Sequence, residues 1–498
     1  PVMNCEYAHC MENSLGNFQE HMDNFEKYDN WIGGFIWDFV DQSIRHVHQD
    51  GSIEWLYGGD FAEGKTDAFF CANGLIASDR SLHPAIAEVK QVYANLSISD
   101  YDPQDHSVMI KNKNVFIDTS YALFIARILS DGLMIDQQLL EVSPIPAGES
   151  RRIALTPFKQ PVDGREFILE VDAVEKVDRP WAKQGHLISF GQFVLSPRQV
   201  KEHIVEESPQ IHLHQNSTQL IIQSSAITVI VDKATGNLAS LDYGNGNLLK
   251  APLSLNLTRA DLDNDCGIEL FVPALRHFNA IRRWENALED KTVSKIETSY
   301  SQGAFTIRIH HKLPLVRHLM TTLKVTSDGR ITVINKITPK KAMIRFGMTL
   351  GLDHTFKHVE FYGRGPWENY RDRKSGSKIG LYQGHLRDFT HDYMRPQENG
   401  NHTEVRFLEV SNDREALRFE ALTPVLMETS VWPYTQDQLK AALHSHELPE
   451  HTMTTVNVDF GQKGVAGDLP GFYLGPAKYH LKAKQSLEYG FSLTHHVC

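Results

Sequence analysis

Glu6 and His9 are the first residues in this chain whose types and spacing could do chemistry. They follow a short apolar run at residues 1–5, which is typical of a buried strand, and they precede a stretch with helical periodicity. In parallel α/β folds, and in (β/α)8 barrels above all, this end of a strand carries the catalytic side chains. A carboxylate there faces a cleft, although Glu6 could equally be a charge that the dipole of the following helix stabilises. The residues alone leave both interpretations open.

Two strand–helix pairs would position these residues. The first helix has apolar side chains at spacings of three and four, and Asn13 or Ser14 could cap its first turn. The second helix has Pro84 at a favourable position in its first turn. We therefore predict strands at residues 1–5 and 33–40 and helices at about residues 14–28 and 84–95.

Longer motifs occur in a fixed order within the first eighty residues. They are Cys5-Glu6-Tyr7-Ala8-His9, Gly33-Gly34-Phe35-Ile36-Trp37-Asp38, Tyr57-Gly58-Gly59-Asp60-Phe61 and Cys71-Ala72-Asn73-Gly74-Leu75. In this order they resemble the end of the catalytic barrel of the large bacterial β-galactosidases of glycoside hydrolase family 2. Residues 362–373 and 396–400 are similar to the C-terminal domain of the same enzymes, so the resemblance extends over the whole chain.

The resemblance implies a multidomain, mostly β fold. Residues 1–96 would be the C-terminal part of a (β/α)8 TIM barrel, since two strand–helix pairs are too few for a barrel of eight. Residues 97–205 contain about seven short β-rich runs, with Asp131-Gly132 as a hairpin signal, and predict an immunoglobulin-like β-sandwich. A linker is expected at about 196–210. Residues 206–498 would form the β-galactosidase small-chain domain, a large β-supersandwich of galactose mutarotase type.

The same resemblance implies an activity. It is the hydrolysis of terminal non-reducing β-D-galactose residues, as in lactose, by a retaining double displacement. That mechanism needs a nucleophilic carboxylate and an acid/base carboxyl group about 5–5.5 Å apart. Glu6 matches the nucleophile of the family. His9 and Trp37 match residues that contact the sugar, although a satisfied core histidine and a barrel-core tryptophan are the alternatives.

Cofactor sites are implied only in part. Asn73 and the backbone carbonyl of Phe70 match a family site where Na⁺ lies beside the 6-hydroxyl of the sugar, and Asn73 would also bind substrate. Oxygen ligands suit a hard cation. The remaining sodium ligand of the family comes from a segment upstream of the matched motifs, so a partial Na⁺ site is expected. The family also implies Mg²⁺, but the residues that would hold it have no counterpart in this chain.

Three departures from the family pattern concern the site. The Gly-Asn-Glu segment that carries the acid/base does not occur in these 498 residues, so the chain alone is predicted to be inactive. Glu12 occupies a position where the family usually has Gly, which puts a charge near the site. The loop at residues 461–473 resembles a loop that reaches the active site, but it lacks the usual Trp, and Phe472 or Tyr473 could take its place beside the leaving group.

Composition excludes several other classes of protein. A net charge of −12 argues against a nucleic-acid partner, and no apolar run has the length of a membrane span. Five cysteines without a Cys-x-x-Cys pair indicate neither a disulfide framework nor a zinc site. We expect a reducing, cytoplasmic location, with the periplasm as the alternative. The chain opens inside a barrel strand, so we expect a piece of a longer polypeptide or a split subunit.

The partners expected from the family are a β-galactoside, an N-terminal half or large subunit, and further copies in a homo-oligomer of the full enzyme. Two rival functions remain. One is a sister glycosidase such as a β-glucuronidase, and the other is a non-catalytic complementing subunit or a carbohydrate-binding fragment. Glu368, Asp372 and His402 would suit epimerase chemistry, but only by analogy of fold. Structural roles are expected for the remaining carboxylates near the site, Asp38, Asp41 and Asp60.

Overall fold

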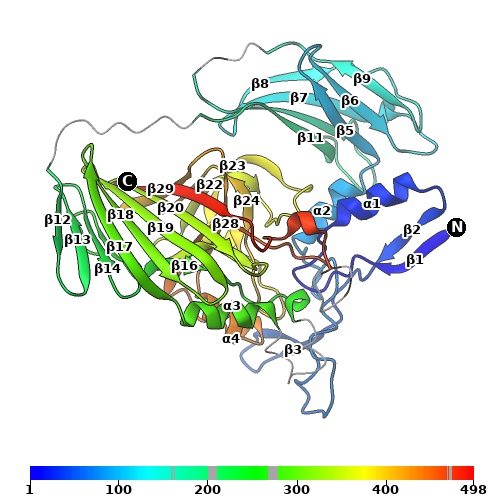
Figure 1. Cartoon of the computed structure of the whole chain (residues 1–498). Helices are drawn as coiled ribbons and strands as arrows, with labels where there is room; N and C mark the ends of the chain where they lie inside the picture. Colours follow the sequence, from blue (N-terminus) through cyan, green and yellow to red (C-terminus); the bar gives the residue numbers. More distant parts are fainter. Residues whose placement is uncertain are drawn as a thin grey trace. The chain divides into compact units, whose positions relative to one another are not determined.

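The computed structural model describes residues 1–158, 161, 163–199, 210–266, 279–467, 469 and 474–497. Strands far outnumber helices along the chain (Figure 1). In the described residues no helix has the length and apolar character that a bilayer crossing requires. The chain divides into two compact units, which are Pro1–Ile86 with His203–Lys374 and Tyr382–Cys498, and Ala87–Glu202 with Ser375–Leu381.

The N-terminal part of the first unit contains the predicted strand–helix–strand order. Strands β1 (Val2–Tyr7) and β2 (Trp31–Ile36) pair in parallel, and helix α1 (Phe18–Lys27) connects them. The prediction that the strand at residues 1–5 is buried is wrong, because Val2 and Met3 are each about half exposed. A parallel sheet buries such side chains only when both of its faces are covered.

The predicted cap of the first helix is also wrong. Helix α1 begins after Asn17, whose φ of 61° is left-handed and whose side chain makes no capping hydrogen bond. Asn13 donates instead to the hydroxyl of Tyr370 at 2.9 Å, and Ser14 donates to the carbonyl of His9 at 3.0 Å. Both side chains are therefore bound to partners outside the helix and cannot satisfy its first turn.

A hairpin lies between β2 and the second helix, where the sequence analysis predicts no element. Its strands are β3 (Ile44–Val47) and β4 (Ile53–Leu56), and helix α2 (Ala85–Val92) follows later. The dipeptide Asp50-Gly51 at its tip is a hairpin signal that could have revealed it. The predicted strand at 33–40 ends earlier, at Ile36, which leaves the residues after it free to form the site.

The second unit is the predicted two-sheet sandwich. Asp131 and Gly132 both have positive φ values, 46° and 85°, so they form the two-residue turn that their sequence predicts. Apolar side chains from both sheets, among them Val108, Phe124 and Phe167, form its core. One sheet has the order β11 (Leu187–Ser196), β10 (Phe167–Glu175), β7 (Ala122–Ser130), β8 (Leu133–Leu140), and the other has the order β5 (Leu96–Asp102), β6 (Ser107–Asn112), β9 (Ser150–Ala154).

The rest of the first unit is a large β-supersandwich, and in the described residues each of its two sheets has nine strands. The first sheet has the order β12 (His212–Gln215), β13 (Gln219–Gln223), β14 (Thr228–Asp232), β15 (Leu238–Asp242), β16 (Leu249–Asn256), β21 (Arg345–Asp353), β28 (Met453–Gln462), β27 (Met427–Trp432), β24 (His402–Val405). The second has the order β17 (Thr292–Ser301), β18 (Ala304–Lys312), β19 (Val316–Thr326), β20 (Ile331–Pro339), β29 (Leu487–Val497), β26 (Glu415–Ala421), β25 (Phe407–Ser411), β22 (His358–Gly365), β23 (Lys378–His385).

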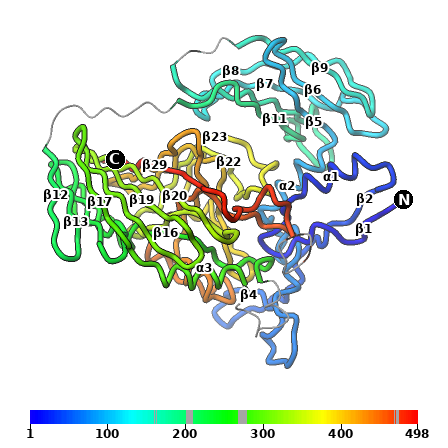
Figure 2. Tube along the Cα trace, viewed as in Figure 1, coloured from blue at the N-terminus to red at the C-terminus, as the bar shows by residue number. Residues whose placement is uncertain are grey.

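Strands that are distant in sequence lie side by side in both sheets. Figure 2 shows the red C-terminal strand β29 beside the green strand β20, with which it pairs in antiparallel register. One contiguous apolar core, which includes Trp284, Phe346 and Phe491, fills the space between the sheets. Helices α3 (Ala280–Glu289) and α4 (Gln436–Ala441) complete this part of the chain. The C-terminal segments thus share one closely packed core, from which loops extend to the N-terminal strands.

Candidate active site

Glu6 and Trp37 lie at the same edge of the parallel strand pair. Glu6 is the second-last residue of β1, its side chain is exposed, and Trp37 directly follows β2. Two backbone hydrogen bonds fix this edge: Trp37 donates to the carbonyl of Tyr7 at 3.1 Å, and Cys10 donates to the carbonyl of Trp37 at 2.7 Å. Trp37 keeps 38% of its surface exposed. Glu6 and Trp37 therefore lie at the carboxyl ends of two adjacent parallel strands, where a (β/α)8 barrel has its active site.

His9 lies just behind this edge and is buried. Its backbone N–H donates to the carbonyl of Gly467 at 2.7 Å, and its ring lies 5.7 Å from the ring of Phe70. Burial lowers the pKa of His9 to about 4, against a weaker opposing effect of the Asp38 charge, so the imidazole is neutral near pH 7. Its Nδ1 has no hydrogen-bond partner in the described parts of the chain. A neutral ring with an unused nitrogen can bond a hydroxyl group.

Asn73 and Phe70 adjoin His9 in a short loop. Asp38 donates its backbone N–H to the carbonyl of Asn73 at 2.6 Å, and the Asn73 amide donates to the carbonyl of Phe70 at 3.1 Å. Asn73 Oδ1 is buried and, within the described residues, has no hydrogen-bond partner. A buried orphan oxygen beside a carbonyl fits the oxygen donors that a hard cation such as Na⁺ takes. No three His, Cys, Asp or Glu side chains of the described residues are placed to hold a metal ion together, and we derive no Mg²⁺ site.

Asp41 connects this loop to the supersandwich. One carboxylate oxygen accepts from the backbone N–H of Gly74 at 2.7 Å, and the other lies 2.7 Å from His83 Nε2. His83 Nδ1 lies in turn 2.8 Å from Nε2 of His391. Because Gly74 follows Asn73, this series of contacts holds the loop that carries the orphan oxygen. The carboxylates of Asp38 and Asp60 also have hydrogen-bond partners. The side chain of Gln42 bonds Asp38, and the ring of His444 bonds Asp60.

Glu12 does not face the exposed edge. Its carboxylate is buried and accepts the backbone N–H groups of Met394 and Arg395 at 3.2 and 3.0 Å. Its φ of 52° is in the left-handed range, which explains why glycine would suit this position. Burial, with smaller effects from Asp263 and Asp41, raises the pKa of Glu12 well above its usual range.

The loop at residues 461–473, here called the C-terminal loop, contacts the segment before helix α1 through its described residues. Asp372 accepts the backbone N–H groups of Val465 and Ala466, each at 2.9 Å, and Gly16 donates its own N–H to the carbonyl of Ala466 at 2.6 Å. A Cβ atom at Gly16 would lie 2.1 Å from the Asp372 carboxylate, so this contact requires glycine. The two candidate aromatic residues of this loop, Phe472 and Tyr473, lie outside the described residues.

The three residues that would suit an epimerase have structural partners instead. Glu368 accepts from Arg373 at 2.7 Å and from the hydroxyl of Tyr393, while Asp372 holds the C-terminal loop. The buried ring of His402 stacks on Phe361 with a centroid distance of 4.2 Å, and burial lowers its pKa to about 4. Nothing in these contacts favours sugar chemistry in this part of the chain.

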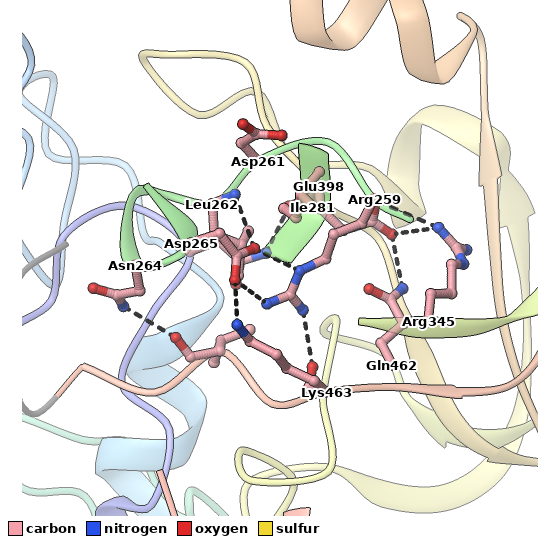
Figure 3. A network of polar contacts seen from close by, with 12 residues as sticks. Arg259, Asp261, Leu262, Asn264, Asp265, Ile281, Arg345, Glu398, Gln462 and Lys463 are labelled. Atoms are coloured by element: carbon pink, nitrogen blue, oxygen red, sulfur yellow. Dashed lines mark hydrogen bonds and ion pairs between the residues drawn. The ribbon is translucent and has the colours of Figure 1, made fainter. Parts of the chain in front are cut away.

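A buried ionic network supports the loop, and the sequence prediction had assigned it no role (Figure 3). Arg259 and Lys463 both contact Asp265, at 2.8 Å each, and Arg345 lies between Glu398 and Asp459, at 3.2 and 2.6 Å. Asn264 donates to the carbonyl of Val465, in the same loop, at 3.0 Å. Such burial of paired charges is costly unless each partner is bonded, and the bond from Asn264 joins the loop to this network at Val465.

Three family models match successive parts of the chain. Residues 223–493 match the family described as β-galactosidase small chain. Residues 1–98 match the TIM barrel domain of glycosyl hydrolases family 2, and residues 108–196 match domain 4 of β-galactosidase. A galactose 1-epimerase from Lactobacillus acidophilus superposes with a TM-score of 0.34 and 8% identity, over 58% of this chain and 98% of its own.

Curated relatives cover almost the whole chain. A β-galactosidase of Priestia megaterium is 31% identical over 99% of this chain and 47% of its own length, and one of Streptococcus thermophilus is 32% identical over 94% and 44%. The chain thus spans slightly less than half the length of these relatives, which fits the C-terminal half of a large enzyme of this kind. On the match that extends over more than half of its residues, the chain belongs to the β-galactosidase small-chain family.

Proposed function

We propose that this chain supplies the nucleophile and part of the sugar pocket of an enzyme that hydrolyses terminal β-D-galactosides with retention. The observation that carries the proposal is the gathering of Glu6, His9, Trp37 and Asn73 at one edge of the β1–β2 pair. These residues come from three separate stretches of sequence, and hydrogen bonds between the stretches hold them there. The named activity of the relatives supports the same reaction.

In the proposed mechanism the ionised carboxylate of Glu6 attacks the anomeric carbon of the galactoside. The glycosidic bond breaks, the leaving oxygen takes a proton from the general acid, and a galactosyl ester on Glu6 remains. Water then gives a proton to the same acid/base residue and attacks the anomeric carbon, which releases galactose with its β configuration and regenerates the Glu6 carboxylate. Trp37 would lie against the apolar face of the ring, and the neutral imidazole of His9 would bond a sugar hydroxyl.

Asn73 Oδ1 and the carbonyl of Phe70 would hold Na⁺, which supplies an electrophile that orients the 6-hydroxyl when it is bound. The fit rests on the buried orphan oxygen of Asn73. Asp41 and His83 would be positioning residues, because they hold the loop that presents this oxygen. The role of Phe472 at the leaving-group side stays a prediction from the sequence.

We infer that the general acid and the Mg²⁺ ligands come from an N-terminal half or a large subunit, and that the full enzyme is a homo-oligomer. Apolar side chains of the N-terminal strand region support a partner surface here, because Ile32, Phe35 and Phe39 are each more than half exposed. Parallel strands are normally covered on both faces. The four described cysteines are free thiols, which is in keeping with a reducing cytoplasm.

A covalent trap tests the assignment of Glu6. The enzyme completed with its N-terminal half would be treated with a 2-deoxy-2-fluoro-galactoside that carries an activated leaving group, and the labelled peptide would be read by mass spectrometry. We expect the galactosyl ester on Glu6, loss of the label in Glu6→Gln, and an unchanged label in the exposed control Glu141→Gln. The chain alone should not turn over unactivated galactosides, since general acid catalysis is worth about 10²–10⁴-fold. Label on a different carboxylate would refute the role of Glu6.

A further inference from the structure

A cleft of about 980 Å³ opens at one end of the β-sandwich in the second unit. Three connections line it: residues 93–95 after α2, residues 114–121 after β6, and residues 175–188, where β10 turns into β11. All of them belong to the same compact unit, and none belongs to the candidate active site. The ends of β-sandwiches commonly carry binding loops, and a cleft of this size suits a small-molecule ligand.

Large aromatic side chains stand exposed around this cleft. Phe116 is 93% exposed, Trp181 is 77% exposed and Tyr93 is 42% exposed. Trp181 lies in a tight turn in which Arg179 donates its backbone N–H to the carbonyl of Ala182 at 2.7 Å, so the indole projects from a fixed backbone. Exposed aromatic surface of this extent has an energetic cost in water, and it marks a binding site when it gathers in one place.

Polar residues also line the cleft, and one of them has an oxygen without a hydrogen-bond partner in the described part of the chain. Glu175 is only 6% exposed, and its Oε2 has no hydrogen-bond partner among the residues that the structure describes. The same oxygen forms an ion pair with Arg179, whose Nε lies 3.5 Å away. Asn114 donates its side-chain amide to the hydroxyl of Tyr121 at 2.9 Å, which places an amide and a phenol at the same wall. A buried carboxylate oxygen without a donor is costly, and a ligand hydroxyl would satisfy it.

We propose that this cleft binds a pyranose unit of a neutral oligosaccharide. A pyranose combines a flat apolar face of C–H groups, which suits an exposed indole or phenyl ring, with hydroxyl groups that donate to a carboxylate and accept from a guanidinium or an amide. Trp181 and Phe116 provide the rings, and Glu175, Arg179 and Asn114 provide the polar partners. An anionic polymer would place its charge against Glu175, and a lipid would place its tail against the same buried carboxylate, so neither fits.

Saturation-transfer NMR on the full chain tests this site, with lactose and a β-1,4-galactotetraose as probes. We expect transfer to the sugar protons and at least about tenfold weaker binding in Trp181→Ala and in Phe116→Ala. Glu175→Gln should also weaken binding, because it removes the charged acceptor for a sugar hydroxyl. Tyr300→Ala, which removes an aromatic side chain that is 59% exposed in the other unit, is the matched control and should bind as the parent does. Glu6→Gln should leave this binding unchanged, which separates it from the proposed catalytic site.

Two results would overturn the inference. One is the absence of saccharide binding at millimolar probe concentrations, and the other is binding that neither Trp181→Ala nor Phe116→Ala alters. If no sugar binds but these variants fail to associate with an N-terminal half, the cleft is a protein interface and not a saccharide site. Thermal unfolding of each variant shows whether it is folded, and Phe116, as the more exposed of the two residues, keeps the test informative if Trp181→Ala misfolds.

Discussion

The backbone N–H of His9 donates a 2.7 Å hydrogen bond to the carbonyl of Gly467. His9 lies three residues after Glu6, the proposed nucleophile, and Gly467 lies in the C-terminal loop. The bond places the loop at residues 461–467 against the segment that follows Glu6, as expected from its resemblance to a loop that reaches the active site. Asp372 of the supersandwich accepts hydrogen bonds from this loop. Hydrogen bonds therefore connect the supersandwich, through the loop, to the segment that carries Glu6.

Gly467→Ala should weaken this connection. Gly467 has a φ of 141°, and an added Cβ would lie 2.9 Å from the carbonyl oxygen of His9 and 3.1 Å from the backbone nitrogen of Leu15. We expect a loss of about 1–3 kcal/mol in stability, together with a lower kcat in the completed enzyme. Urea unfolding and steady-state kinetics measure the two effects. Gly64→Ala is the control, since no atom lies within 4 Å of its added Cβ. Equal kinetics for both variants would contradict the link.

Asp41→Asn should change how the completed enzyme responds to Na⁺. The substitution weakens the contacts that Asp41 makes with Gly74 and His83, both at 2.7 Å, and so loosens the loop with the orphan oxygen of Asn73. We expect KM for a galactoside to rise about three- to tenfold at low Na⁺, with partial recovery at high Na⁺ and a smaller change in kcat. His391→Ala should shift the same parameters less. Asp79→Asn, near the same loop, is the control, and an unchanged sodium dependence in Asp41→Asn would refute the positioning role.

Local features of the fold could be predicted from the sequence. The order β1–α1–β2 follows from apolar periodicity, and the turn at Asp131-Gly132 follows from its dipeptide. Long-range choices could not be predicted in this way. Asn13 has the chemistry of a helix cap, yet its amide donates to Tyr370 and to the carbonyl of Glu398, more than 350 positions along the chain. A cap prediction cannot weigh such a competitor, because it considers only neighbouring residues.

The candidate site could also be predicted only in part from the sequence. Resemblance to a family singled out Glu6, His9, Trp37 and Asn73, and periodicity added only the point at which β1 ends. Neither indicated that Arg345 would be buried between Glu398 and Asp459, because these residues come from distant strands and loops and meet only in the folded sandwich. Glu12 looked like a charge beside the site, and its actual partners, the N–H groups of Met394 and Arg395, are set by tertiary packing.

Arg345→Met should destabilise the chain strongly. It removes the cation between two fully buried carboxylates, those of Glu398 and Asp459, and leaves them uncompensated. We expect a loss of about 3–5 kcal/mol in the free energy of unfolding, measured by urea denaturation. Lys336→Met is the matched control, because its ion pair with Glu488 is about half exposed, and it should cost about 0–1 kcal/mol. Similar losses for the two variants would show that burial of the ion pair does not determine how much stability is lost when its cation is removed.

Acid should destabilise the chain through His402. Burial lowers the pKa of His402 from its usual value near 6.5 to about 4 in the folded chain, whereas the unfolded chain keeps the usual value. Between pH 6.5 and 4 the unfolded state therefore binds more protons, so stability falls as the pH falls through this window. At pH 5 this difference in the pKa of His402 should lower the free energy of unfolding by about 2 kcal/mol. His9, buried with a pKa of about 4, acts in the same direction.

His402→Phe isolates this effect. The phenyl ring keeps the stacking on Phe361 but gives up the 3.0 Å hydrogen bond between Nδ1 and the carbonyl of Arg364, which should cost about 1 kcal/mol at any pH. The variant should therefore be less stable than the parent at pH 7 and should lose less stability between pH 7 and pH 5. Urea unfolding at several pH values measures both slopes, with the exposed His354→Gln as the control. Parallel slopes for parent and His402→Phe would mean that His402 is not the neutral, buried group that its contacts indicate.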